Sequence, residues 1–152
     1  MNEANLGRLL VFRVGNLACA AEVDQVREIL PRLPTTRIPG APPVVAGLVN
    51  VRGTLVTVVD GLRALGQEPP QPPAAPQPTI IILEVPTGET EKLVGFTVDE
   101  VIDMLGPDAV ALEDRAALPG IDPTLVRAVG RHNGQVFIVL NVAALLGPIL
   151  TT

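Results

Sequence analysis

The side chains that most often carry out catalysis are scarce in this chain. It has one cysteine, Cys19, one histidine, His132, and one lysine, and it has no serine and no tyrosine. A thiolate activated by an imidazole is therefore the only nucleophile and base combination that these residues can form. Cys19 lies in the segment LACAAEV, where a small buried hydrophobic residue is the ordinary interpretation. We therefore predict a binding protein and not an enzyme.

The charged residues and the single cysteine give no sign of a metal site or a nucleic-acid-binding surface. The adjacent carboxylates Asp99/Glu100 and Glu113/Asp114 are typical of solvated strand ends or turns. A single cysteine can form neither an internal disulfide nor a metal site with several thiolates. The formal net charge is −5 and the basic residues are spread singly, so nothing resembles a stripe that follows phosphates. We expect no metal, no cofactor and no nucleic-acid partner.

The N-terminal segment predicts a cytoplasmic protein. Its short apolar stretch is preceded by Glu3 and broken by Arg13, which is not the pattern of a secretory signal. No uninterrupted apolar run is long enough to span a bilayer, so we expect no direct membrane insertion. The lone cysteine fits a reducing compartment.

Apolar β-branched runs dominate the chain and predict strands. The hydrophobic content is 47%, with only three aromatic residues, so the core must consist of Val, Leu and Ile. Strands are expected at residues 8–14, 45–51, 54–60, 79–85, 92–98, 125–131 and 135–141. Short helices are expected at 61–66 and 142–147, with Asp60 and Asn141 as their N-caps. The proline-rich tract 68–78 predicts an exposed connector between two halves of similar size.

Two segments recur on either side of the proline tract. VDQVREIL (23–30) aligns with VDEVIDML (98–105) at an offset of 75 residues. GTLVTVVDGLRALG (53–66) aligns with GQVFIVLNVAALLG (134–147) at an offset of 81. The order of the two units is the same, so we predict a duplicated all-β unit. We expect each half to form one of two small closed barrels that share an interface, because closed barrels would hide the sheet edges of so short a chain.

The repeat pairs the dipeptide Arg52-Gly53 with Asn133-Gly134. Asn-Gly is a signal for a two-residue hairpin, because both positions accept the positive φ of a type I′ turn. An arginine in the equivalent position has two interpretations. Arg52 is either a solvated turn residue or a group that binds an acidic partner through its forked guanidinium. The residues alone favour the interpretation of Arg52 as a solvated turn residue.

The chain resembles the CheW-like adaptor domain of bacterial chemosensory systems. The resemblance rests on VREI (26–29), TTRIPGAPPVVAGLVNVRG (35–53) and LVTVVDGLRALG (55–66), and it extends through VGFTVDEV (94–101) to VFIVLNVAALL (136–146). It implies an all-β fold of two small five-stranded, SH3- or OB-like barrel lobes on a shared hydrophobic core, within one domain over residues 7–150. It also implies a non-catalytic adaptor that couples chemoreceptors to a CheA-type histidine autokinase.

The resemblance also implies a receptor-binding groove. The family's V-x-E-I and N-x-R-G motifs place the groove residues at Val26, Glu28 and Arg52 of this chain. Three further residues match the family as backbone-shaping positions: Gly47, Asn50 and Gly53. The expected partners are the cytoplasmic hairpin tip of a chemoreceptor and the regulatory domain of the kinase, which binds a separate surface. The protein would then lie in the cytoplasm beside membrane-bound receptor arrays.

The chain departs from the family pattern at three positions. Thr57 replaces a proline, Gly61 replaces a leucine, and Asn141 replaces an aspartate. Two alternatives to the coupling function stay open. One is a CheW-like scaffold for surface motility or another output, and the other is a small β-barrel that binds a small ligand.

Overall fold

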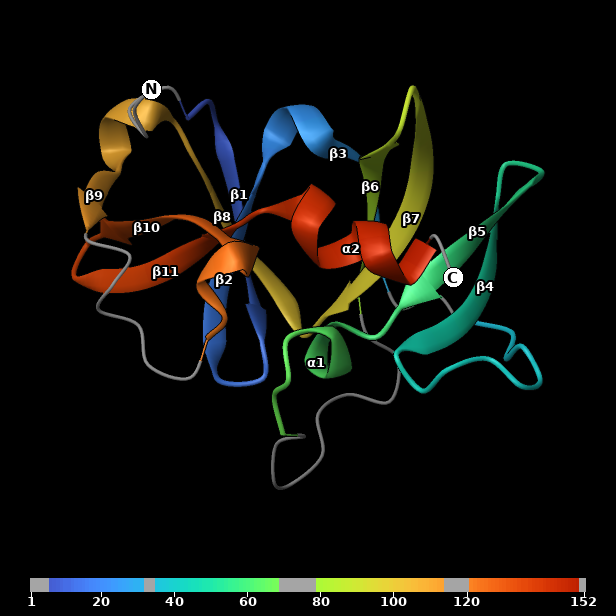
Figure 1. Cartoon of the computed structure of the whole chain (residues 1–152). Helices are drawn as coiled ribbons and strands as arrows, with labels where there is room; N and C mark the ends of the chain where they lie inside the picture. The colour runs from blue at the N-terminus through green and yellow to red at the C-terminus, as the bar shows by residue number, and fades with distance from the viewer. Residues whose placement is uncertain (1–5, 32–34, 69–78, 114–120, 151–152) are drawn as a thin grey trace.

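Strands make up most of the computed structural model, which describes residues 6–31, 35–68, 79–113 and 121–150 (Figure 1). The strands are β1 (Leu9–Val14), β2 (Leu17–Glu22), β3 (Val26–Leu30), β4 (Val45–Val51), β5 (Thr54–Val59), β6 (Thr79–Thr87), β7 (Thr90–Val98), β8 (Glu100–Leu105), β9 (Ala111–Glu113), β10 (Val126–His132) and β11 (Gln135–Leu140). Two short helices, α1 (Gly61–Ala64) and α2 (Val142–Leu150), follow β5 and β11. The predicted all-β class with few short helices is confirmed.

The strands form two sheets that each combine both halves of the chain. One sheet has the order β3-β6-β7-β5-β4 and the other has the order β8-β1-β2-β11-β10-β9. We call the first sheet and its interior the first lobe, and the second sheet and its interior the second lobe. Strands β3 to β5 precede the proline tract and pair with β6 and β7, which follow it. The expectation that each half would build its own lobe is therefore wrong: the halves exchange strands.

The strand pairings confirm the duplication. β4 and β5 pair through Val45↔Val59 and Gly47↔Val58, with a bulge between the two pairs. β10 and β11 repeat this register and bulge at an offset of 81, through Val126↔Leu140 and Ala128↔Val139. Both second strands also have a parallel neighbour, β7 for β5 and β2 for β11. Val58 and Val139 thus hold equivalent positions, as do Val59 and Leu140.

The buried apolar residues of the described ranges form three clusters. One lies inside the first lobe around Val58, Ile80 and Ile82, and one lies inside the second lobe around Leu9, Val11, Phe137 and Val139. The largest cluster lies between the lobes and takes in residues of both sheets and of α2. Strand β6 is buried on both faces, because Ile80 and Ile82 point into the lobe while Ile81 and Leu83 point into the shared cluster. In Figure 1, α2 lies between the two lobes.

Most of the predicted connector, residues 69–78, lies outside the described residues. Its exposure, and the extent of a single domain over 7–150, stay predictions.

Candidate partner-binding site

The turn between β4 and β5 holds Arg52 in a left-handed conformation. Arg52 has φ 53° and Gly53 has φ 87°. Asn50 stabilises the turn, because its side-chain Oδ1 accepts a hydrogen bond from the Gly53 N–H at 2.8 Å. Among the described residues, only Arg52 and Asn133 have positive φ without being glycine. A left-handed conformation costs most residues roughly 1–2 kcal/mol, and asparagine is among the few residues besides glycine that tolerate it. Turn chemistry therefore does not explain the arginine.

The guanidinium of Arg52 binds the carboxylate of Glu28 through two hydrogen bonds. The Nη1···Oε1 distance is 2.9 Å and the Nη2···Oε2 distance is 3.2 Å. Glu28 lies on β3 and Arg52 follows β4, which are the two edge strands of the five-stranded sheet. The pair thus joins opposite edges, so the sheet must curve round into a barrel. The sequence placed both residues in one groove, and the structure brings them into direct contact.

The ion pair lies at the surface. The Arg52 side chain is 80% exposed and the Glu28 side chain is 25% exposed. Pairs of this kind typically contribute about 0–1 kcal/mol to stability, because water already solvates both charges. The pair therefore leaves an accessible charged surface that a partner can contact, and the fold does not depend on it.

Arg27, which precedes Glu28, forms an ion pair on the other side of β3. Its guanidinium pairs with Glu84 on β6, and this hydrogen bond lowers the pKa of Glu84. A hydrogen bond to Glu84 raises the pKa of Glu91 on β7. Successive β3 side chains thus bind in opposite directions, with Arg27 toward β6 and Glu28 toward the β4–β5 turn.

Gly47 allows the chain before β4 to pass close to the strand. Thr36 and Leu48 exchange two backbone hydrogen bonds, of 2.9 Å and 2.8 Å. A Cβ atom at position 47 would lie 2.4 Å from the Thr36 carbonyl oxygen, closer than real contacts allow. A residue with a Cβ atom at position 47 would therefore prevent this close approach, whereas glycine permits it. Val26, at the start of β3, is half buried and packs against the shared cluster.

A family model described as "CheW-like domain" matches residues 8–148. The chain belongs to the CheW-like domain family. It is 34% identical over 128 residues to "Chemotaxis protein CheW" of Rhizobium meliloti (strain 1021), covering 84% of this chain and 77% of that protein. It is 32% identical over 93 residues to "Protein PilI" of Pseudomonas aeruginosa, covering 61% of this chain and 49% of that protein.

The CheW-like fold is supported by a solved structure. The scaffolding protein TtCheW from Thermoanaerobacter tengcongensis superimposes with a TM-score of 0.77 at 21% identity, covering 92% of each chain. The match to "Probable chemotaxis protein CheW" of Rhizobium etli spans only 59% of that relative's length. The family resemblance found in the sequence is thus confirmed, whereas the roles of Val26, Glu28 and Arg52 stay predictions.

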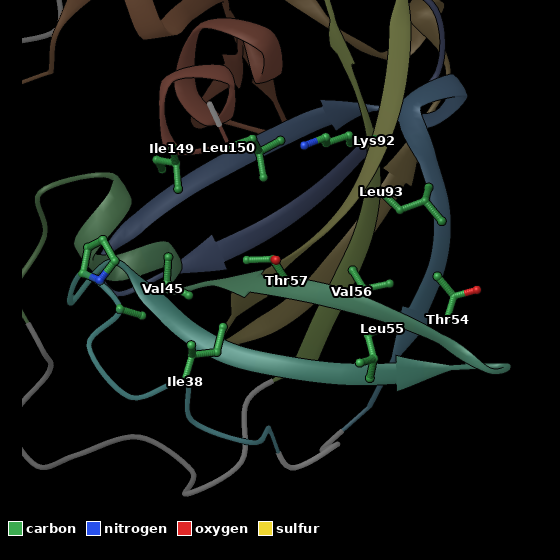
Figure 2. A pocket seen from close by; sticks show the side chains of 12 residues that line it. Ile38, Val45, Thr54, Leu55, Val56, Thr57, Lys92, Leu93, Ile149 and Leu150 are labelled. Atoms are coloured by element: carbon green, nitrogen blue, oxygen red, sulfur yellow. The ribbon is translucent and has the colours of Figure 1, made fainter. Parts of the chain in front are cut away.

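The CheW-like chain also has an apolar groove that the sequence did not reveal. Its cavity of about 550 Å³ lies between the β4–β5 hairpin, β7 and the end of α2 (Figure 2). Leu55 is 65% exposed there and Leu93 is 40% exposed, while Ile149 and Leu150 line the helix side. Leu55 lies on the same face of β5 as Thr57, opposite Val56 and Val58, but residue type alone does not show which apolar residues face solvent.

The structure does not bring together the one conceivable catalytic pair. Cys19 is buried in the shared cluster. His132 ends β10 at the far tip of the second lobe, where its Nδ1 lies 2.8 Å from the Ala109 carbonyl oxygen. No three His, Cys, Asp or Glu side chains are grouped to hold a metal ion within the described ranges. No helix in these ranges is long and apolar enough to cross a membrane.

Burial raises the pKa of the Cys19 thiol to about 12. We expect a thiol reagent at pH 8 to leave the native protein unmodified and to label it fully after denaturation. Because the folded pKa is raised, stability is unaffected below the unfolded pKa near 9. It should fall by about 1.4 kcal/mol per pH unit as the pH rises from there toward 12. Denaturant titrations of wild type and Cys19→Val measure this slope. An equal slope in both proteins, or rapid native labelling, would contradict the burial.

Proposed function

We propose that this protein is a non-catalytic adaptor that couples chemoreceptors to a CheA-type histidine autokinase. The observation that supports it best is Arg52, an arginine kept in a left-handed turn and held by Glu28 at an exposed surface. A turn needs no such residue, whereas a guanidinium and a carboxylate side by side offer both charges to a polar helical tip. In this function the protein acts in the cytoplasm beside receptor arrays.

In this proposal the receptor hairpin tip binds beside Val26, Glu28 and Arg52. The regulatory domain of the kinase binds the apolar groove that includes Leu55 and Leu93. An exposed apolar surface of this kind favours a protein partner. The two surfaces lie on different parts of the first lobe, because the groove faces α2 and the ion pair joins β3 to the turn.

A reconstitution with purified components tests the function. The protein is mixed with a soluble receptor-tip dimer and with the kinase regulatory domain, and complexes are separated by size-exclusion chromatography. We expect a ternary complex whose formation requires this protein. The proposal is wrong if the protein binds neither component.

The match to PilI, a relative whose name does not mention chemotaxis, supports a second candidate, in which the same scaffold serves a system with another output. The two candidates are distinguished by measuring whether the protein binds the receptors and kinase of a chemotaxis system or those of another chemosensory system in the native cell.

Leu55→Asp is expected to weaken kinase binding at least about tenfold, because a charge would enter the apolar groove that the partner covers. Stability should change little, since the side chain is 65% exposed. The matched control is Val136→Asp, at the equivalent position of the second lobe and 41% exposed. Titration calorimetry with the kinase regulatory domain measures both variants. Equal affinities for Leu55→Asp and Val136→Asp would show that the groove is not the kinase surface.

A further inference from the structure

The duplication gives the second lobe a counterpart of the Glu28 position. In β3, Glu28 follows the extra residue of a bulge, Arg27. In β8, Asp103 follows the extra residue of an equivalent bulge, Ile102, at an offset of 75. Glu28 and Asp103 are therefore equivalent by register, and each lobe has a carboxylate at this place.

The second lobe also has a counterpart of the Arg52 turn, but without the arginine. Asn133 has φ 52° and is followed by Gly134, just as Arg52 with φ 53° is followed by Gly53. The two turns therefore have the same backbone form. Asparagine is too short and carries no charge, so position 133 supplies no cation like the one that binds the carboxylate in the first lobe.

Asp103 is an exposed carboxylate without an ion pair among the described residues. Among the residues that the structure describes, its Oδ1 accepts a hydrogen bond only from the adjacent Met104 N–H, at 2.8 Å. In the first lobe, by contrast, the equivalent carboxylate binds a guanidinium through both oxygens. The second lobe thus leaves most of the acceptor capacity of Asp103 free.

A cavity of about 200 Å³ lies where the second lobe lacks this guanidinium. Its lining includes Asp103, His132 and Asn133 together with the buried residues Val11, Leu105 and Phe137. A water molecule occupies only about 30 Å³ of liquid, so the cavity can hold a side chain. The Ala109 carbonyl can only accept, so Nδ1 of His132 must donate to it. Nε2 of the neutral ring is then a second acceptor.

An apolar interior with acceptors at its edge matches a long cationic side chain. The methylene stem packs on the apolar residues while the charged end binds the carboxylate. A guanidinium matches better than an ammonium, because its planar fork can pair with both oxygens of Asp103. Asp103 and His132 alone are too few ligands for a structural metal site.

We propose that the second lobe binds an arginine side chain of a partner protein in the cavity between β8 and the β10–β11 turn. Asp103 pairs with the partner's guanidinium as Glu28 pairs with Arg52 in the first lobe. The arginine is thus supplied by the chain itself in one lobe and by the partner in the other. This site is separate from the two surfaces of the proposed function and does not depend on it.

The test uses the full ¹⁵N-labelled protein titrated with N-acetyl-arginine methylamide. We expect saturable amide shifts confined to the cavity lining, at Val11 and residues 101–105 and 132–137, smaller shifts with the lysine analogue, and none with the uncharged norleucine analogue. Absence of saturable shifts in these segments would overturn the proposal. Equal binding of the lysine analogue would overturn the preference for a guanidinium.

Two variants and a matched control make the test specific. Asn133→Arg should rebuild the pair of the first lobe within the second lobe and thereby abolish the shifts. Asp103→Asn should abolish them by removing the charge. Glu100→Gln removes a carboxylate from the same strand, β8, but outside the cavity, so it should bind as wild type does. Melting curves confirm that each variant is folded. Wild-type binding by Asn133→Arg would refute the proposed equivalence of the two lobes.

Discussion

Arg52→Glu is expected to keep the fold and kinase binding while it removes most affinity for the chemoreceptor tip. The ion pair with Glu28 is exposed, so its loss costs the fold about 1 kcal/mol at most. At the receptor interface the same charge would be covered by the partner. Loss of one member of such a pair costs roughly 2–5 kcal/mol, or about 30-fold to about 5,000-fold in affinity. Titration calorimetry with a receptor-tip dimer measures this loss.

Three further variants decide what the pair does. Glu28→Arg should lose receptor binding in the same way as Arg52→Glu. The double variant restores an internal pair with reversed charges, so it should stay defective if the receptor contacts these groups. Recovery of receptor binding in the double variant would instead show that the ion pair acts by maintaining the shape of the first lobe. Arg63→Glu reverses another exposed charge of the first lobe and should bind normally. Unchanged receptor binding in both single variants would show that Glu28 and Arg52 do not form the receptor site.

The sequence predicted the long strands well because their own side chains determine them. β4, β5 and β11 are rich in β-branched residues, and two-residue turns join β4 to β5 and β10 to β11, so local chemistry is sufficient. Strand β2 was not assigned, because LACAAE has three alanines and low strand propensity. It forms because it lies buried between β1 and β11, and burial is a property of the tertiary structure.

The exchange of strands between the halves could not be predicted from a repeat. A duplicated unit folds with the same local patterns whether its strands pair within one copy or between the two copies. The pairing of β3 with β6, across the proline tract, is decided by packing in three clusters that no single segment encodes. For the same reason the repeat identified equivalent residues correctly, whereas the prediction that each half of the chain forms one lobe was wrong.

The candidate site was predictable in part. The turn at Arg52 and the special role of Gly47 follow from residue types and the motif, and the structure gives both a geometric reason. The contact between Glu28 and Arg52 depends on barrel closure, which joins residues 24 apart in sequence across opposite sheet edges. No local pattern contains that information.

Gly61 is a departure from the family pattern that the packing explains. The family usually has leucine after the aspartate that caps this helix. Here a Cβ at position 61 would lie 2.2 Å from the Thr97 carbonyl oxygen and 3.2 Å from the Phe96 ring. Phe96 is fully buried and makes an edge contact with Phe12, with ring centroids 6.2 Å apart. Strand β7 and its aromatic ring thus occupy the space that a side chain on α1 would need.

Gly61→Ala is therefore expected to destabilise the protein by about 3 kcal/mol, the upper end of the usual cost of overpacking. The obstacle is the backbone of β7, so a rotamer change cannot relieve it. The shift must also lengthen the hydrogen bond from the Gly61 N–H to Thr97 Oγ1, now 2.9 Å. For a domain of this size the melting temperature should fall by about 6–12 °C in a thermal scan.

The matched control is Gly106→Ala. Gly106 has φ −76° and ψ 164°, which alanine adopts freely before a proline, and nothing lies within 4 Å of its would-be Cβ. The same chemical change should therefore stabilise the protein by about 0.4–1 kcal/mol through the unfolded chain. Opposite signs at the two positions would show that contact with β7, and not the loss of a glycine, destabilises Gly61→Ala. A Gly61→Ala protein that melts at or above the wild-type temperature would contradict the close approach of α1 to β7.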